Sequence, residues 1–204
     1  LNIIPIESVM EDFDNDGFVD ILVTGSSYQF FHNNGDKTFT LLPGIFGNEN
    51  MESFAIGDLN HDGLIDVYAS YAYIYTSPST VDDVYWMNTT GNGNHFVTLN
   101  LIGTSSNMGA LGARAKIYGD WGVQLREVHA GESYGTCNTA NLHFGTGTAT
   151  VIDSIVVQWP SGMNTTILNP AIDQFITIRE NECVTPNLTI SNNGGTVICP
   201  GESV

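Results

Sequence analysis

The residues of this chain best suited to chemistry are the aspartates of the stretch EDFDNDGFVDILVTG, residues 11–25. Asp12, Asp14, Asp16 and Asp20 stand within nine residues, and an apolar, β-branched segment follows the last of them. Carboxylates at this spacing repel one another unless a cation neutralises them or water solvates each of them. The stretch therefore indicates cation binding beside a segment that favours burial.

A second acidic loop, DLNHDGLID at residues 58–66, repeats the first, DFDNDGFVD at residues 12–20. In both loops, positions one, three, five and nine carry a side-chain oxygen, and position six is Gly. The loops begin at residues 12 and 58, a period of 46 residues. One such loop could be a solvated turn, but two copies that both close on Asp indicate a binding motif.

The pattern of oxygen donors fits Ca²⁺, which takes six to eight oxygen ligands at about 2.3–2.6 Å. A loop wrapped around an ion presents alternate side chains to it, and Gly at position six permits the turn that aims the carbonyl of position seven inward. We therefore predict two calcium sites. The ligands predicted for the first are Asp12, Asp14, Asp16, the Phe18 carbonyl and Asp20, and those for the second are Asp58, Asn60, Asp62, the Leu64 carbonyl and Asp66. Because Asn60 carries no charge, we expect the second site to bind more weakly.

Other metals and other loop types fit this pattern less well. Mg²⁺ prefers a small octahedral shell and keeps its waters, whereas Zn²⁺ prefers His or Cys ligands. His61 stands at an even position, so we expect it to point away from the ion. An EF-hand needs flanking helices and Glu at position twelve, but that position holds Val23 in the first loop and Ala69 in the second.

The composition favours metal cations as partners and disfavours polyanions. The 204 residues include 22 acidic and 5 basic side chains, for a net charge of -17. Nucleic-acid binding needs a basic face, and anionic membrane surfaces attract basic segments, so we expect neither partner. No apolar run is long enough for a transmembrane helix. Neither a signal peptide nor an initiator Met is visible, and we expect the chain to be part of a longer, multidomain protein.

The spacing of apolar residues predicts an all-β fold. Apolar runs are short and bounded by Gly or Asn, as is typical of strands, and 42% hydrophobic residues suffice for a core. Each acidic loop precedes a strand, an aromatic pair, a turn with Asn and Gly, and a further strand. With one strand ahead of the loop, each copy predicts a four-stranded propeller blade. We assign residues 1–94 to two blades of a partial β-propeller.

The pattern changes after residue 94 to alternating strands without an acidic loop. HFVTLNLIG places Val97, Leu99 and Leu101 on one face. Further predicted strands cover residues 113–119, 123–130, 151–159 and 174–180. We therefore expect residues 95–180 to form a β-sandwich-like domain. Residues 181–204 are expected to begin an Ig-like module or to form a linker.

Both parts resemble known families. The two acidic repeats resemble FG-GAP/VCBS repeats, the calcium-loop blades of integrin-like β-propellers, and the resemblance implies the ten metal ligands named above. That family builds about seven blades, so two cannot close a propeller. NHFVTLNLIGTSSNMGALGARAKIY, REVHAGESYGTCNTANLHFGTG and VIDSIVVQWPSG resemble the ASPIC/UnbV domain, which follows such repeats in many secreted proteins. The activity of that domain is poorly defined.

Other reactive residues are assigned structural roles. His129, Cys137 and His143 lie close in sequence, and a Cys-His pair can make a nucleophile, but no activating partner is visible beside them. Cys183 and Cys199 could form a disulfide, which spacing alone does not decide.

The tyrosines of YAYIY, residues 71–75, share one face of a predicted strand. They would serve blade packing or, as the alternative, a sugar-stacking platform.

Two classes of function remain open. The first is a non-catalytic extracellular or cell-surface module with structural Ca²⁺ loops, for adhesion or for binding a glycan or protein. The second is part of a secreted polysaccharide lyase or sugar dehydratase built on a propeller scaffold. No constellation of catalytic acid and base is visible, which favours the first class.

Overall fold

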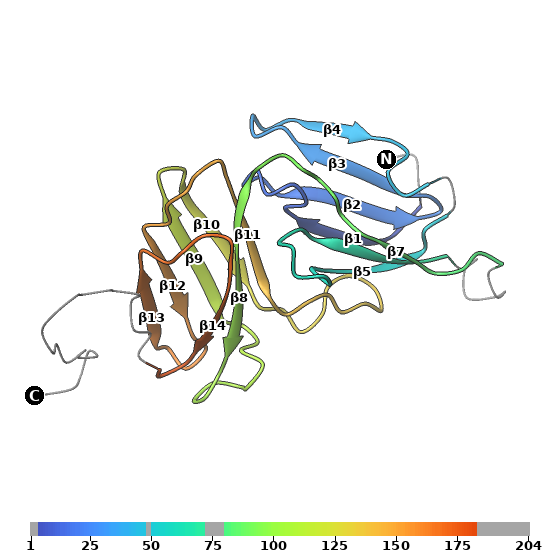
Figure 1. The fold of residues 1–204 in the computed structure, drawn as a ribbon. Helices are drawn as coiled ribbons and strands as arrows, with labels where there is room; N and C mark the ends of the chain where they lie inside the picture. Colours follow the sequence, from blue (N-terminus) through green and yellow to red (C-terminus); the bar gives the residue numbers. More distant parts are fainter. Residues whose placement is uncertain (1–3, 48–49, 72–79, 183–204) are drawn as a thin grey trace, which may run out of the picture.

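A computed structural model describes residues 4–47, 50–71 and 80–182 of the chain, which form strands and loops with no helix among them. The all-β prediction is therefore confirmed. Figure 1 shows two lobes, with the strands of the acidic repeats in one and the later strands in the other. Among these described residues, no helix is long and apolar enough to cross a membrane.

The first repeat forms one complete antiparallel blade. Its strands follow one another in space as they do in sequence: β1 (Pro5–Glu11), β2 (Asp20–Gly25), β3 (Gln29–Asn33) and β4 (Phe39–Leu42). The first acidic loop joins β1 to β2, and the register pairs Glu11 with Asp20 across its base. The two ends of the loop are thereby held together by the sheet.

In the second repeat, the described residues form a sheet of three strands. Its described strands are β5 (Ser53–Gly57), β6 (Asp66–Ser70) and β7 (Val84–Trp86), and the second acidic loop joins β5 to β6. The segment that aligns with β4 belongs to β8 (His95–Ile102), which pairs with other strands. The first copy thus has the four predicted strands, and the described residues of the second copy supply three. All four residues of β4 are exposed.

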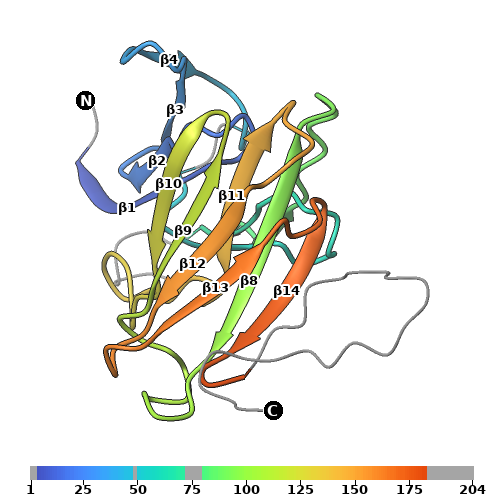
Figure 2. The ribbon, with the colours of Figure 1, turned by 90° about the vertical axis from the view of Figure 1, so that its left-hand side faces the viewer.

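The remaining strands form a domain of two sheets. Its strands are β8, β9 (Arg114–Gly119), β10 (Gly122–Glu127), β11 (Leu142–Gly147), β12 (Ser154–Gln158), β13 (Asn164–Leu168) and β14 (Gln174–Arg179). One sheet has the order β10-β9-β12-β13 and the other β11-β8-β14, in which β14 runs parallel to β8. Figure 2 views this domain with the blades behind it. The strands β11 and β13 were not predicted from the sequence.

Each lobe has its own apolar core. One core fills the space between the two sheets of the later domain, and it includes Val97, Leu99 and Leu101, the face predicted for β8. The other lies between the two blades and joins Phe30 and Phe46 to residues of the second repeat. Both cores bury side chains from two sheets, so each stabilises the contact between its sheets.

Of the tyrosines and cysteines named in the sequence analysis, some have a visible role and others lie outside the described residues. Tyr71 is buried, and its hydroxyl accepts a hydrogen bond from Trp86 Nε1 at 2.9 Å, which is a packing role. Tyr73, Tyr75, Cys183 and Cys199 lie outside the described residues. So does the Ig-like module apart from residues 181 and 182.

Candidate metal centre

The first acidic loop folds back on its own carboxylates. Gly17 N donates to Asp12 Oδ2 at 2.8 Å, Asp16 N donates to Asp14 Oδ1 at 3.2 Å, and Phe18 N donates to Asp16 Oδ1 at 2.8 Å. Gly17 has a φ of 92°, which glycine adopts without strain. Each of the three aspartates therefore gives one oxygen to the backbone and presents a second oxygen to other partners.

Asp12 carries the strongest sign of a missing cation. Its side chain is fully buried, and its Oδ1 has no hydrogen-bond partner within the described part of the chain. Burial raises the pKa of this carboxyl well above its usual range, and the nearby charges of Asp16 and Asp14 raise it further. A buried carboxylate oxygen without a partner costs free energy unless an ion or another charge compensates it. The donor set of this loop therefore fits a hard cation.

Two groups of side chains in this region could hold a metal ion. The first joins Asp12, Asp14 and Asp20, and the second joins Asp14, Asp16 and His32, with ligand atoms within 4.8 Å of one another in each group. Between them, the two groups contain all four aspartates that the sequence assigned to the first site, and they share Asp14. The assignment of all four to one ion stays a prediction.

His32 was not predicted as a site residue. It lies in β3 rather than in the loop, and the sequence reading confined the ligands to the loop itself. The sequence did not single it out, because its approach depends on a long-range contact: Asn33 N donates to Asp20 Oδ1 at 2.8 Å. That contact brings the end of β3, and with it His32, to the metal centre.

Asp20, the last loop aspartate, links the loop to the sheet. It is buried, and besides Asn33 N it accepts a hydrogen bond from Phe13 N at 3.3 Å. Burial raises its pKa to about 6 despite these hydrogen bonds. In the second loop, Asp66 accepts equivalent hydrogen bonds from Leu59 N at 3.0 Å and Asn88 N at 2.8 Å.

The second loop adopts the same turn but is more exposed. Gly63 N donates to Asp58 Oδ2 at 2.7 Å and Leu64 N donates to Asp62 Oδ1 at 2.9 Å, as in the first loop. Asn60 Nδ2, however, donates to Asp62 Oδ2 at 2.8 Å and so occupies the oxygen that would face an ion.

A group of three His, Cys, Asp or Glu side chains at this spacing is found among the described residues only at the first loop. The ligand assignment of the second site, and those of the Phe18 and Leu64 carbonyls, stay predictions.

The first loop is covered by the later domain through a chain of hydrogen bonds. Thr98 Oγ1 lies 3.0 Å from His143 Nδ1, and His143 Nε2 lies 2.6 Å from Asn15 Oδ1. Asn15 Nδ2 in turn donates to Gly63 O in the second loop at 2.8 Å. Burial lowers the pKa of His143 to about 3, with a further contribution from Arg126. The imidazole is therefore neutral and donates from Nε2.

Position four of each loop points away from the carboxylates and toward the later domain. Asn15 and His61 both have left-handed backbone, with φ of 60° and 61°. The ring of His61 packs against Phe175 with centroids 4.9 Å apart. A Cβ at Gly145 would overlap Asp12 Oδ2 and the Asn15 backbone. The expectation that His61 points away from the ion agrees with this contact.

His129, Cys137 and His143, the residues considered for nucleophilic catalysis, line a separate cavity. A cavity of about 420 Å³ between the lobes is lined by His129, Cys137 and His143 among others. Cys137 is an exposed free thiol whose Sγ lies 3.8 Å from Ala130 O, and His143 is engaged by Asn15 as described above. These contacts give His143 a structural role in joining the lobes.

Comparison with known families agrees with this organisation. Residues 12–69 match the family model of the FG-GAP-like repeat, and residues 103–185 match the family model named ASPIC and UnbV. The chain therefore consists of an FG-GAP-like repeat region followed by an ASPIC/UnbV domain, as the sequence motifs indicated. No curated protein matches the chain.

Proposed function

We propose that this chain is a calcium-stabilised, non-catalytic β module of an extracellular or cell-surface protein. Its Ca²⁺ ions are structural, and the surface that they stabilise binds a glycan or a protein in adhesion. The observation that carries the metal assignment is the buried Asp12 carboxylate, whose Oδ1 has no hydrogen-bond partner in the described part of the chain.

The location of the loops supports a structural rather than a catalytic role for the ion. The first loop lies between β1 and β2, and its Asn15 contacts both the second loop and the ASPIC/UnbV domain. An ion held there fixes three parts of the molecule at once. Binding to the folded state alone adds stability by mass action.

The choice of calcium and of an extracellular setting follows from the donors. Both loops offer oxygen ligands in the spacing that Ca²⁺ prefers. Calcium sites of extracellular modules typically bind with dissociation constants of about 10⁻⁴ to 10⁻³ M. Sites of that affinity are filled only where calcium is abundant, so we propose an extracellular setting.

A second cavity supports a role in ligand binding. It has a volume of about 370 Å³, and the residues that line it include Asp14, Asp20 and His32 of the first repeat and the aromatic residues Phe46 and Trp86. Apolar and aromatic walls with a few convergent polar groups are typical of small-molecule sites. The cavity is consistent with capture of a saccharide or of a side chain from a partner protein.

Thermal denaturation tests the metal assignment. The melting temperature should fall on addition of EDTA and return when Ca²⁺ is added in excess. An unchanged melting curve in both conditions would refute the structural role of calcium.

Glycan-array binding without turnover would support the binding module. Release of unsaturated sugars from a polysaccharide panel would instead support the alternative of a lyase.

A further inference from the structure

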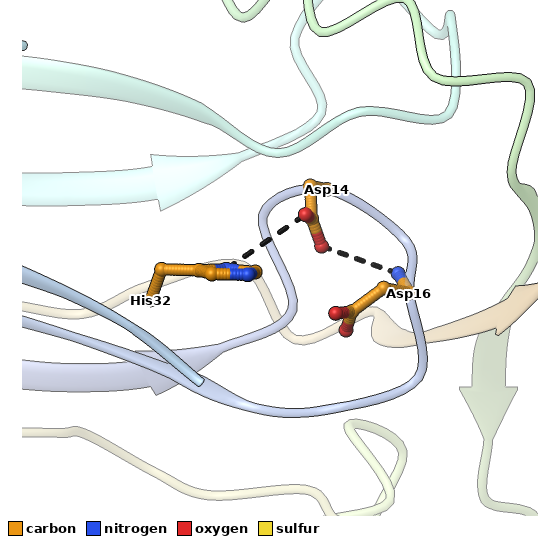
Figure 3. Close-up of side chains that lie close together, drawn as sticks. All are labelled: Asp14, Asp16 and His32. Carbon is orange, nitrogen blue, oxygen red and sulfur yellow. Dashed lines mark hydrogen bonds and ion pairs between the residues drawn. The ribbon is translucent and has the colours of Figure 1, made fainter. Parts of the chain in front are cut away.

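The imidazole of His32 faces the carboxylates of the first loop. His32 Nδ1 lies 3.8 Å from Asp14 Oδ2 and 3.2 Å from Asp20 Oδ1, and 28% of its side chain is exposed. Figure 3 shows the ring at the end of β3 pointing to Asp14, with Asp16 on the other side of that carboxylate. A nitrogen donor is therefore placed beside two carboxylates that the sequence assigned to calcium.

These separations suit a shared metal ion. Zn²⁺ and similar ions bind imidazole nitrogen and carboxylate oxygen at about 2.0–2.2 Å. Neighbouring ligands in a tetrahedral or octahedral shell of that size are then roughly 3.0–3.5 Å apart. The distance of 3.2 Å from His32 Nδ1 to Asp20 Oδ1 lies within this range, and that of 3.8 Å to Asp14 Oδ2 lies just beyond it. The ligand atoms of Asp14, Asp16 and His32 all lie within 4.8 Å of one another.

The carboxylates beside His32 retain oxygens for an ion. Asp14 and Asp16 each use Oδ1 to accept a backbone N–H, and Oδ2 of Asp14 is the atom that faces the imidazole. The unpartnered and buried Oδ1 of Asp12 independently points to a cation in this loop. One imidazole and two carboxylates, those of Asp14 and Asp16, therefore lie close enough together to share an ion.

The donor types distinguish this group from an all-oxygen calcium site. Ca²⁺ takes oxygen ligands, so His32 adds nothing to its coordination. Imidazole suits Zn²⁺, Co²⁺, Ni²⁺ and related ions, whose affinity rises with nitrogen donors. We therefore infer that His32 raises the affinity of the first loop for transition-metal ions without adding a ligand for calcium.

The second repeat supplies a natural comparison, because Met87 replaces His32 there. Asn33 N donates to Asp20 Oδ1 and Asn88 N donates to Asp66 Oδ1, both at 2.8 Å, which makes Asn33 and Asn88 equivalent. The residues before them are His32 and Met87. The two loops therefore share one turn and differ in the presence of an imidazole beside it.

We propose that the first loop is a mixed nitrogen and oxygen site that binds a divalent transition-metal ion, such as Zn²⁺ or Co²⁺, through Asp14, Asp16 and His32. This proposal rests on the proposed metal binding by the same loop. The ion competes with calcium because both use Asp14. The second loop, with Met87, selects calcium over such ions.

The test exchanges the equivalent residues of the two repeats. Zn²⁺ and Ca²⁺ are titrated separately into the metal-free chain by calorimetry, and Co²⁺ is followed by its visible absorption. His32→Met gives the first loop the residue of the second and should lower the affinity for Zn²⁺ and Co²⁺ by about tenfold or more, while the calcium affinity stays within about twofold. Calcium should displace Co²⁺ from the wild-type chain.

Two further variants keep the result interpretable. His32→Gln retains a hydrogen-bond donor toward Asp20 and should show the same loss if His32→Met fails to fold. His61→Asn removes the histidine of the second loop, places there the residue found in the first, and should leave Zn²⁺ affinity unchanged.

The outcomes separate this proposal from the proposed function. Unchanged Zn²⁺ and Co²⁺ affinity in both His32 variants, with calcium still binding, would overturn the mixed site alone. Absence of calcium binding to the wild-type chain would overturn the proposed function.

Discussion

The two acidic loops of this protein form the same turn but leave their carboxylates in different surroundings. In the first, Asp12 is fully buried and its Oδ1 has no partner among the described residues. In the second, the equivalent Asp58 is partly exposed, and Asn60 donates to Asp62 Oδ2 at 2.8 Å. The same nine-residue pattern therefore gives one site that needs a cation and one that is partly satisfied without it.

The difference comes from what covers each loop. Strand β11 of the ASPIC/UnbV domain lies directly on the first loop, where Gly145 leaves no room for a side chain beside Asp12. The second loop also packs on this domain, through His61 against Phe175 and Gly63 against Phe96, but these contacts leave Asp58 partly exposed. Burial strengthens the need for a counter-charge, so the covering domain, rather than the motif alone, sets how strongly each loop requires its ion.

The largest expected effect is that of Gly145→Ala. The new Cβ would overlap Asp12 Oδ2 and the Asn15 backbone, and overpacking of this kind typically costs about 1–3 kcal/mol and occasionally more. We expect a loss of about 3 kcal/mol in the free energy of unfolding, measured by urea denaturation, together with weaker calcium binding. Gly91→Ala is the control, because nothing lies near that position. Equal effects of the two substitutions would contradict the close packing on the first loop.

A ligand substitution in each loop tests their ranking directly. At a calcium concentration a hundred times the dissociation constant, binding adds about 2.7 kcal/mol, which Asp16→Ala should remove. Asp62→Ala should remove less, because the second site is expected to bind more weakly.

Thermal melts with calcium and with EDTA measure both losses. Asp36→Ala, in a turn outside both loops, should leave the calcium response intact. A response lost equally in all three variants would argue against the ligand assignment.

The hydrogen bonds between the lobes give a smaller effect that does not depend on the ion. Asn15→Ala would leave Gly63 O and His143 Nε2 without a buried partner, at a cost of about 1–3 kcal/mol. His61→Ala, at the same position of the second loop, removes a ring contact and should cost less. Equal losses in urea denaturation would show that both loops are anchored to the domain alike.

The smallest expected effect is a dependence of the melting temperature of the metal-free protein on pH. Burial raises the pKa of Asp20 to about 6 and that of Glu11 to about 7. These two groups therefore hold protons in the folded state that the unfolded state has released, and each lowers stability as the pH rises from about 4 to its own pKa. His143, whose pKa burial lowers to about 3, acts in the opposite direction over part of this range. Asp20→Asn should remove one of the destabilising contributions, so in EDTA its melting temperature should gain on that of the wild-type chain as the pH rises from about 4 to 6. A constant difference between the two over this range would contradict the assignment.

The sequence predicted what depends on local spacing. The alternation of oxygen donors, the glycine at position six and the outward direction of position four were all readable from nine residues. The repeat also predicted the strands on either side of each loop, because apolar runs between turn residues favour strands.

The contacts and strands that the sequence did not predict depend on packing between residues far apart in the chain. The contact between Asn15 and His143 joins residues 128 positions apart, and the approach of His32 depends on pairing between β2 and β3. β11 was missed because its sequence, LHFGTG, holds two glycines and little apolar alternation. β8 was assigned to the later domain, and the structure pairs it there with β11 and β14.

Calorimetric titration of Ca²⁺ into the metal-free chain tests the central claim most directly. We predict two binding events, of which Asp12→Asn removes the tighter and Asp58→Asn removes the weaker. Absence of calcium binding, or retention of the tighter event in Asp12→Asn, would contradict the account of the first loop as the principal metal centre.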